Sequence, residues 1–357
     1  MDAAAALAAD PAAAGYRLAS SYGDLPGEEL TLVAGLEVLP SGNVVVLDTG
    51  GGRFMVLDAG LRPVSSIGRL GQGPGELEFV PWARFGRAPD LLAADDTLLY
   101  VANGAAAVSL FTHDGAFRRN LLWRLSAASG VDANRSLRQL VGLSADGIAV
   151  RERRLGPEGV AERLAVLSWE ALERRTASGR DPLLASEWVS RPIVPGPNGA
   201  PGTFSPPCEA GPLWFADGAT VVVSDGLDSA IGGVGGAVRT TDLPDPDAIC
   251  AAGSDIKRRA EALIGVENLP SVRRRLRWTA IALDPAGSLW LREWRPPGES
   301  GPVAVIVRRD GSVARVRLPD FPWAFTPDGG FVAVHEDTET GVQSIRLYAA
   351  EPGADGG

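Results

Sequence analysis

The sequence predicts an all-β fold, a six-bladed β-propeller built from four-stranded antiparallel blades. Runs of four to seven mostly apolar residues recur from residue 30 to residue 348 and are separated by Gly, Asp and Asn turns. In five of six units, a short strand, a turn containing Gly and a Val-, Leu- or Ile-rich strand follow one another in that order. Such regularity is typical of repeat architectures, and 357 residues are enough for one closed ring with a large core.

The first two units lie at 36 to 79 and 82 to 123. The first contains an apolar run, a turn at 41 to 43, a second apolar run and a glycine-rich exit. The second contains the strands LLYVAN and VSLFTHDG and closes on an Asp-Gly turn at 114 and 115. Branched and aromatic residues between turn-forming residues favour strands over helices.

The third and fourth units lie at 137 to 176 and 212 to 243. LVGLSADGIAVRE and RLAVLSWE are the strands of the third, and LWFADGATVVVSDG and GAVRTTDL those of the fourth. Between the two units, residues 179 to 207 are rich in Pro and Gly, which predicts a long loop inserted between blades.

The fifth and sixth units lie at 277 to 318 and 323 to 348. A second insertion, 245 to 275, contains a predicted short helix with Ser254 as its N-cap and Gly265 as its stop. Both insertions follow the outermost strand of a blade, so we expect them on one face of the ring. There they would roof the central channel and contact a partner.

The chain ends predict how the ring closes. The sixth unit offers three clear strands, while YRLASSY at 16 to 22 is an orphan strand at the other terminus. We therefore expect the N-terminal strand to complete the last blade and remove the free sheet edges. The Ala-rich residues 1–15 and the tail 352–357 are expected to be disordered, so 16–351 form one domain.

Charge and hydropathy narrow the possible partners. A net charge of −10 and a pI near 4.9 argue against a nucleic acid, which requires a basic surface. The sequence contains no apolar run of about 18 residues, so we expect no transmembrane helix. Asp2 stands where a secretory signal needs a basic region, and Asp10 interrupts the apolar stretch, so no signal peptide is expected. We expect a monomer.

A recognisable motif covers residues 36 to 86. VVVLDTGGGRFMVLDAG and SSIGRLGQGPGELEFVPW together resemble NHL-type repeats, in which an Asp ends the second strand and a Gly-Pro-Gly-Glu loop leads to the next blade. The chain is thus similar to bacterial six-bladed β-propeller proteins of unassigned function, NHL-like or TolB-like. The resemblance implies export to the periplasm or cell envelope, although this sequence lacks a lipobox cysteine. The residues that carry the motif are Asp48, Gly60, Gly68, Gly71, Gly73, Pro74, Gly75 and Glu76.

Aromatic and arginine residues recur at the starts of the predicted blades, where one mouth of the channel is expected. Arg and Trp would suit an anionic or ring-bearing ligand there. Alternatively, the tryptophans wedge between neighbouring blades as packing residues. The candidate ligand-binding residues are Trp82, Arg84, Arg138, Phe204, Arg277, Trp278 and Trp323.

A non-catalytic scaffold that binds a protein or a small molecule, without a cofactor, is the leading functional interpretation. The alternative is a metal-dependent, lactonase-like hydrolase in which channel carboxylates hold calcium. Acids at strand ends also cap turns or face solvent, which would make them structural. The candidate carboxylates are Glu37, Glu152, Asp225, Glu293 and Glu336. His113 and His335 lie in unrelated units, which argues against a histidine-based zinc site.

Two further features have alternative interpretations. Cys208 and Cys250 flank the fourth unit, so they form either a disulfide between blade connections or two unrelated thiols. The glycine-rich run from Gly68 to Gly75 lacks the Lys-Ser/Thr pair of a phosphate-binding loop and does not open a helix, so we interpret it as a turn between blades.

Overall fold

A computed structural model describes most of the chain between residues 12 and 351. The described residues are 12–13, 15–71, 74–77, 90–94, 97–103, 107–122, 135–144, 147–156, 159–168, 184–186, 189–191, 193–195, 201–203, 213–216, 220–224, 229–234, 237–244, 276–295, 301–337 and 339–351. Their regular structure is β-strand throughout, and they contain no helix that could span a membrane. The helix predicted at Ser254 falls outside these residues.

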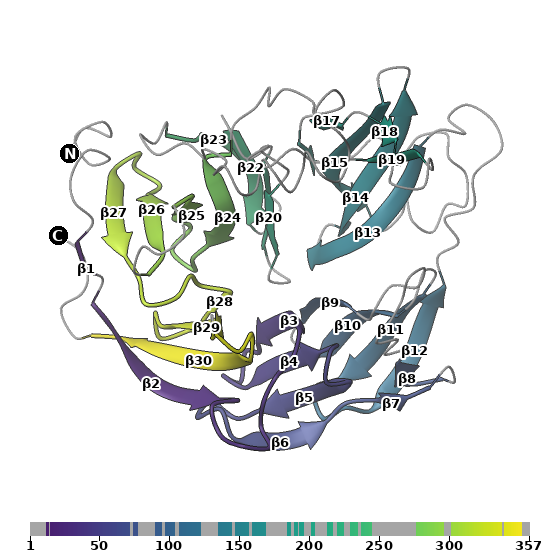
Figure 1. Cartoon of the computed structure of the whole chain (residues 1–357), viewed down its shortest axis with the longest axis vertical. Coiled ribbons are helices and arrows are strands. Elements are labelled where there is room, and N and C mark those ends of the chain that lie inside the picture. Colours follow the sequence, from purple (N-terminus) through teal and green to yellow (C-terminus); the bar gives the residue numbers. More distant parts are fainter. Residues whose placement is uncertain are drawn as a thin grey trace.

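The strands form six large sheets of four or five strands and two small sheets of two strands. The large sheets stand around a common centre, with their innermost strands facing it (Figure 1). Within the large sheets neighbouring strands are antiparallel, with a single parallel pair at the outer edge of one sheet. The chain is therefore an all-β propeller. We number the large sheets one to six along the chain and name their strands from the centre outward.

The first sheet consists of β3 (Val33–Val38), β4 (Val44–Asp48), β5 (Arg53–Leu57) and β6 (Pro63–Ser66). The second consists of β9 (Asp90–Ala94), β10 (Leu98–Asn103), β11 (Ala107–Thr112) and β12 (Phe117–Leu122). The third consists of β13 (Arg135–Ser144), β14 (Gly147–Gly156), β15 (Gly159–Ser168), β16 (Leu184–Ala185) and β17 (Val189–Arg191).

The fourth sheet consists of β20 (Leu213–Ala216), β21 (Thr220–Ser224), β22 (Ser229–Val234) and β23 (Ala237–Asp242). The fifth consists of β24 (Trp278–Leu283), β25 (Leu289–Glu293), β26 (Val303–Val307), β27 (Val313–Arg317) and β1 (Ala12–Ala13). The sixth consists of β28 (Ala324–Phe325), β29 (Phe331–Glu336), β30 (Gln343–Ala350) and β2 (Tyr16–Tyr22). The small sheets pair β7 (Arg69–Leu70) with β8 (Glu76–Leu77), and β18 (Ile193–Pro195) with β19 (Pro201–Thr203).

Strands with apolar residues on both faces hold the sheets together. In β4 every residue is buried, because each face of the first sheet packs against a neighbouring sheet. Val44 and Val46 join a core cluster shared with the sixth sheet, whereas Val45 and Leu47 join a cluster shared with the second. This two-sided burial explains why the strand is a continuous apolar run and does not alternate with polar residues.

Aromatic rings fill the largest core cluster, which spans the fourth, fifth and sixth sheets. Trp278 is fully buried there. Tyr16 on β2 makes edge-on contacts with two aromatic rings. The distance between ring centroids is 6.5 Å to Trp290 and 4.9 Å to Phe331. Edge-on pairs of this kind add to the burial of the rings. The N-terminal strand is therefore part of this core.

Three segments differ from the sequence-based expectation. Residues 179–207, predicted as a loop that follows the outermost strand of a blade, contain β16 and β17, which pair with β15 at the outer edge of the third sheet, and the antiparallel pair β18–β19. Pro and Gly are tolerated at edge positions of a sheet, so their abundance alone did not exclude strands. Within 1–15, expected to be disordered, Ala12 and Ala13 form β1 and pair in parallel with Val316 and Arg317 of β27. Alanine has no strand preference, so this short pairing depends on the neighbouring sheet. The glycine-rich loop after the first sheet contains a parallel pair of short strands, β7 and β8, in addition to turns.

Candidate functional site

The top face of the propeller, as we call it, is the face where the innermost strands begin and the second strands end. Leu32, Arg277 and Trp323 directly precede the innermost strands β3, β24 and β28. Leu32 is 54% exposed and Trp323 is 40% exposed, while Arg277 is half-buried. The fifth, sixth and first sheets thus each place a large side chain where an innermost strand begins.

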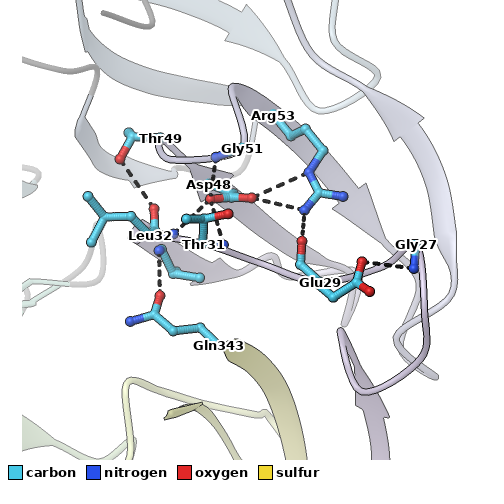
Figure 2. A network of polar contacts seen from close by, with 10 residues as sticks. Gly27, Glu29, Thr31, Leu32, Asp48, Thr49, Gly51, Arg53 and Gln343 are labelled. Carbon is cyan, nitrogen blue, oxygen red and sulfur yellow. Dashed lines mark hydrogen bonds and ion pairs between the residues drawn. The ribbon is translucent and has the colours of Figure 1, made fainter. Parts of the chain in front are cut away.

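Asp48, at the end of β4, is a fully buried carboxylate. Its Oδ1 accepts hydrogen bonds from the main-chain N–H groups of Leu32 and Gly51, both at 3.0 Å, and of Thr31 at 3.3 Å. Its Oδ2 accepts bonds from Arg53 Nη2 at 3.0 Å and Nε at 3.3 Å (Figure 2). With both oxygens saturated, Asp48 holds the start of β3 and the turn after β4 in place.

Gln343 fastens the sixth sheet to the first at the same face. Its Oε1 accepts a hydrogen bond from Val33 N at 2.7 Å (Figure 2). Its main chain also exchanges hydrogen bonds with Leu30, at 3.0 and 3.3 Å. Arg53 extends this network by donating to the Glu29 carbonyl. The polar network therefore spans the boundary between the first and last sheets of the chain.

Glu293, at the end of β25, lies in a second buried ion-pair cluster. Arg315 Nε and Nη2 donate to its two oxygens at 2.8 and 2.9 Å, and Arg295 Nη2 adds an ion pair at 3.0 Å. Trp278 lies opposite Glu293 in the strand pairing, and none of the described residues accepts a hydrogen bond from its buried indole N–H. The two-point Arg315 contact is the geometry that gives arginine–carboxylate pairs their directionality.

Asp320 is the centre of a third cluster, on the side of the sixth sheet that faces the fifth. Its Oδ1 lies 2.9 Å from His335 Nδ1, and its Oδ2 accepts a 2.5 Å bond from the Tyr348 hydroxyl. Arg346 Nη1 lies 3.8 Å from the same oxygen. Asp320 belongs to the segment that connects β27 to β28, so the cluster ties this connection to β29 and β30.

Tyr348 gives the third cluster a measurable pH signature. Burial, and then the hydrogen bond to Asp320, raise the pKa of Tyr348 from 10.0 to about 12. A raised pKa means that the folded chain holds this proton where the unfolded chain loses it, so stability falls as pH rises from about 10 to about 12. We expect wild type to lose more stability across this window than Tyr348→Phe, measured as urea midpoints. If wild type and Tyr348→Phe lose the same stability across this pH window, the raised pKa of Tyr348 would be contradicted.

The structure places only some of the predicted ligand-binding residues. Trp278 is fully buried, which agrees with the packing alternative for this tryptophan. Arg277 and Trp323 retain exposed surface on the top face. Arg138 lies on β13, where only the backbone is described. Three other candidates lie outside the described residues, as do both cysteines: Trp82, Arg84, Phe204, Cys208 and Cys250.

The carboxylates predicted to hold calcium do not converge on one point in the described part of the chain. Glu37 is buried on β3 in the first sheet, whereas Glu293 is held by two arginines in the fifth. Glu336 is exposed at the end of β29. Glu152 lies on β14 with only its backbone described, and Asp225 lies outside the described residues. Calcium binding at these carboxylates remains a prediction.

Sequence reasoning did not identify the Asp320 cluster. Asp320 precedes Tyr348 by 28 residues and lies outside any strand, so no local pattern connects the two. Asp48 was found only as part of the repeat motif. A carboxylate at the end of an apolar strand is a weak signal for the buried network seen here, because most such acids face solvent.

Comparison with known proteins supports the fold. No protein family and no curated protein sequence matches the chain. A Bacteroides fragilis protein provisionally described as exported superposes with a TM-score of 0.53 at 11% identity, over 96% of this chain and 97% of its own. A DUF4221 family member from Bacteroides vulgatus gives 0.49 at 10% identity, over 96% of each chain.

Virginiamycin B lyase from Staphylococcus aureus gives a TM-score of 0.42 at 13% identity, over 93% of this chain and 99% of its own. A structural match at identities this low can show a shared fold at most and carries no information about chemistry. Of these three structures, only the B. fragilis protein superposes closely enough to show that the fold is shared. The chain is a β-propeller, and its function has to be argued from its own residues.

Proposed function

We propose that the chain is a non-catalytic binding propeller that engages a protein or small molecule at its top face. The exposure of Trp323 is the observation that supports this most. Tryptophan is a large apolar residue that contributes strongly to binding interfaces, and here it is 40% exposed immediately before an innermost strand. Leu32 and Arg277 occupy the corresponding positions in the neighbouring sheets and would extend the contact surface.

The networks beneath this surface support a binding role. Asp48, Glu293 and Asp320 are each held by two or more partners, so the ends of the strands are rigid. A surface that is already ordered loses little conformational freedom when a partner binds. Arginine beside exposed aromatic and aliphatic side chains would suit a ligand with an anionic group and an apolar body.

The proposal includes a six-bladed ring in which each large sheet is one blade and β2 closes the circle. β2 supplies the outer strand of the sixth sheet, while β28 contacts β3 of the first sheet. Successive innermost strands are also in contact from β3 through β9, β13 and β20 to β24. Such closure would leave the top face as one continuous binding surface around the channel.

The test compares Trp323→Ala with Val64→Ala as immobilised proteins in an extract of the organism that encodes the chain. Val64 is also exposed, at 61%, but lies on β6 at the outer edge of the first sheet. We expect at least one protein or small molecule, quantified by mass spectrometry, to be retained equally by wild type and Val64→Ala. Its retention should fall at least fivefold with Trp323→Ala, about 1 kcal/mol. Identical retention by all three proteins would contradict the proposal.

A further inference from the structure

The innermost strand of the sixth sheet is too short to cover the strand beside it. β28 has two residues, which pair with Phe331 and Val332 of β29. β29 continues to Glu336 and is paired with β30 along its whole length. Among the described residues, 333–336 of β29 therefore have a strand on one side only, and their other edge faces the centre of the ring.

The first and fifth sheets show what normally covers this edge. In the first sheet the innermost strand reaches the end of the second, so that Val33 pairs with Asp48. In the fifth sheet Trp278 pairs with Glu293 in the same way. The uncovered part of β29 is thus a local feature of the sixth sheet and not a property of every blade.

This edge presents main-chain groups that have no partner within the described part of the chain. Val332 O accepts a 2.9 Å bond from Trp323 N, which shows that the polar groups of Val332 point toward the centre. Because these groups alternate along a strand, those of Val334 and Glu336 point the same way. No described residue bonds these two N–H groups or these two carbonyls on that side. Val334 is half-buried and Glu336 is exposed.

The connection from β27 does not fill this place. Asp320, midway along it, bonds to His335 and Tyr348. Tyr348 shares a core cluster with Trp290 of the fifth sheet, so this side of the sixth sheet faces the fifth. The connection therefore crosses between the two sheets and joins the inner edge only at Trp323.

The side chains on either side of the edge are already held in place. His335 is oriented by Asp320 on one face of the sheet. On the other face, Gln343 Nε2 donates to Glu336 Oε2 at 3.2 Å. A strand edge ordered before binding requires little further ordering when another chain pairs with it.

We propose that the inner edge of β29 at 333–336 binds an extended peptide segment of a partner protein, which pairs as a strand antiparallel to β29 above Trp323. This inference rests on the proposed binding function and specifies how the partner is engaged. Main-chain hydrogen bonds to Val334 and Glu336 provide the attachment, as in other cases of strand addition to a free edge. The guest takes the place that the first half of β3 takes in the first sheet.

The test uses a pool of random-sequence hexapeptides, because main-chain pairing tolerates many sequences. Amide resonances of the isotope-labelled full chain are followed by NMR as the pool is added. We expect the amides of Val334 and Glu336 to shift and to gain protection from exchange. Those of Ala333 and His335, already paired with β30, should change much less. The matched control is the same pool N-methylated at every residue, which leaves the guest no main-chain N–H to donate to the carbonyls of Val334 and Glu336.

Each outcome decides the proposal. An alternating response that is lost with the N-methylated pool supports it, and Val334→Pro should then weaken binding about three- to tenfold by removing one donor. No response at Val334 and Glu336, or an equal response to both pools, would overturn it. If the pool fails while Trp323→Ala still releases a partner, the proposed function stands and only the strand-addition mode is wrong.

Discussion

Removing residues 1–22 is expected to destabilise the propeller by about 5 kcal/mol. The deletion removes β2 from the outer edge of the sixth sheet and with it Tyr16 and Tyr22, two aromatic residues packed into the core. Burying one such side chain contributes about 2–3 kcal/mol. The loss would equal a large part of the total stability of a typical domain. Urea unfolding followed by tryptophan fluorescence measures it.

The control for this truncation removes only residues 1–11, which precede both β1 and β2. A synthetic peptide of residues 12–22 should restore stability to the longer truncation, whereas a scrambled peptide should not, because only the native sequence restores the pairing with β30. If the two truncated chains unfold at the same urea concentration, the N-terminal strand does not close the ring.

Asp48→Ala is expected to cost about 3–5 kcal/mol, because removal of one partner leaves the other groups of a buried network without a counterpart. Three main-chain N–H groups and the Arg53 guanidinium lose their acceptor. Asp48→Asn keeps one carbonyl oxygen but turns an amide N–H₂ toward Arg53, so its cost should be intermediate. Chemical unfolding at neutral pH compares the three chains.

Asp58 provides the matched control. It accepts main-chain bonds from Gly60 at 2.8 Å and Arg62 at 2.9 Å in the next turn along the chain, but it lies nearer the solvent. Asp58→Ala should therefore reduce stability much less than Asp48→Ala. Similar losses for the two variants would show that burial of the Asp48 network contributes little beyond ordinary turn hydrogen bonds.

The strands and hairpin turns could be predicted because their signals are local. The predicted strand LLYVAN is β10, and the predicted turn at 114 and 115 is closed by a 2.8 Å bond from Gly115 N to Thr112 O. Gly115 has φ +89°, a conformation that favours glycine. Residues a few positions apart determine such turns whatever the rest of the chain does.

The candidate site could be predicted only in part. Arginine and tryptophan at the starts of blades suggested a binding mouth, but the same pattern describes the buried Trp278 and the exposed Trp323. The short β28 had no visible signal, since WAFTPDGGFVAVHED reads as an ordinary strand, turn and strand. Whether such a segment pairs along two residues or six depends on the path of the preceding connection.

The sequence by itself determined the β-strand content, the repeat and the positions of the turns, because these follow from residue propensities and alternation over short distances. Only the tertiary structure decided which strands pair across the chain termini, which carboxylates are buried and which strand edge has no partner among the described residues. Each of these depends on contacts between residues far apart in the chain, such as Val33 with Gln343 and Asp320 with Tyr348. Such contacts form only when whole sheets pack together, and no local pattern encodes them.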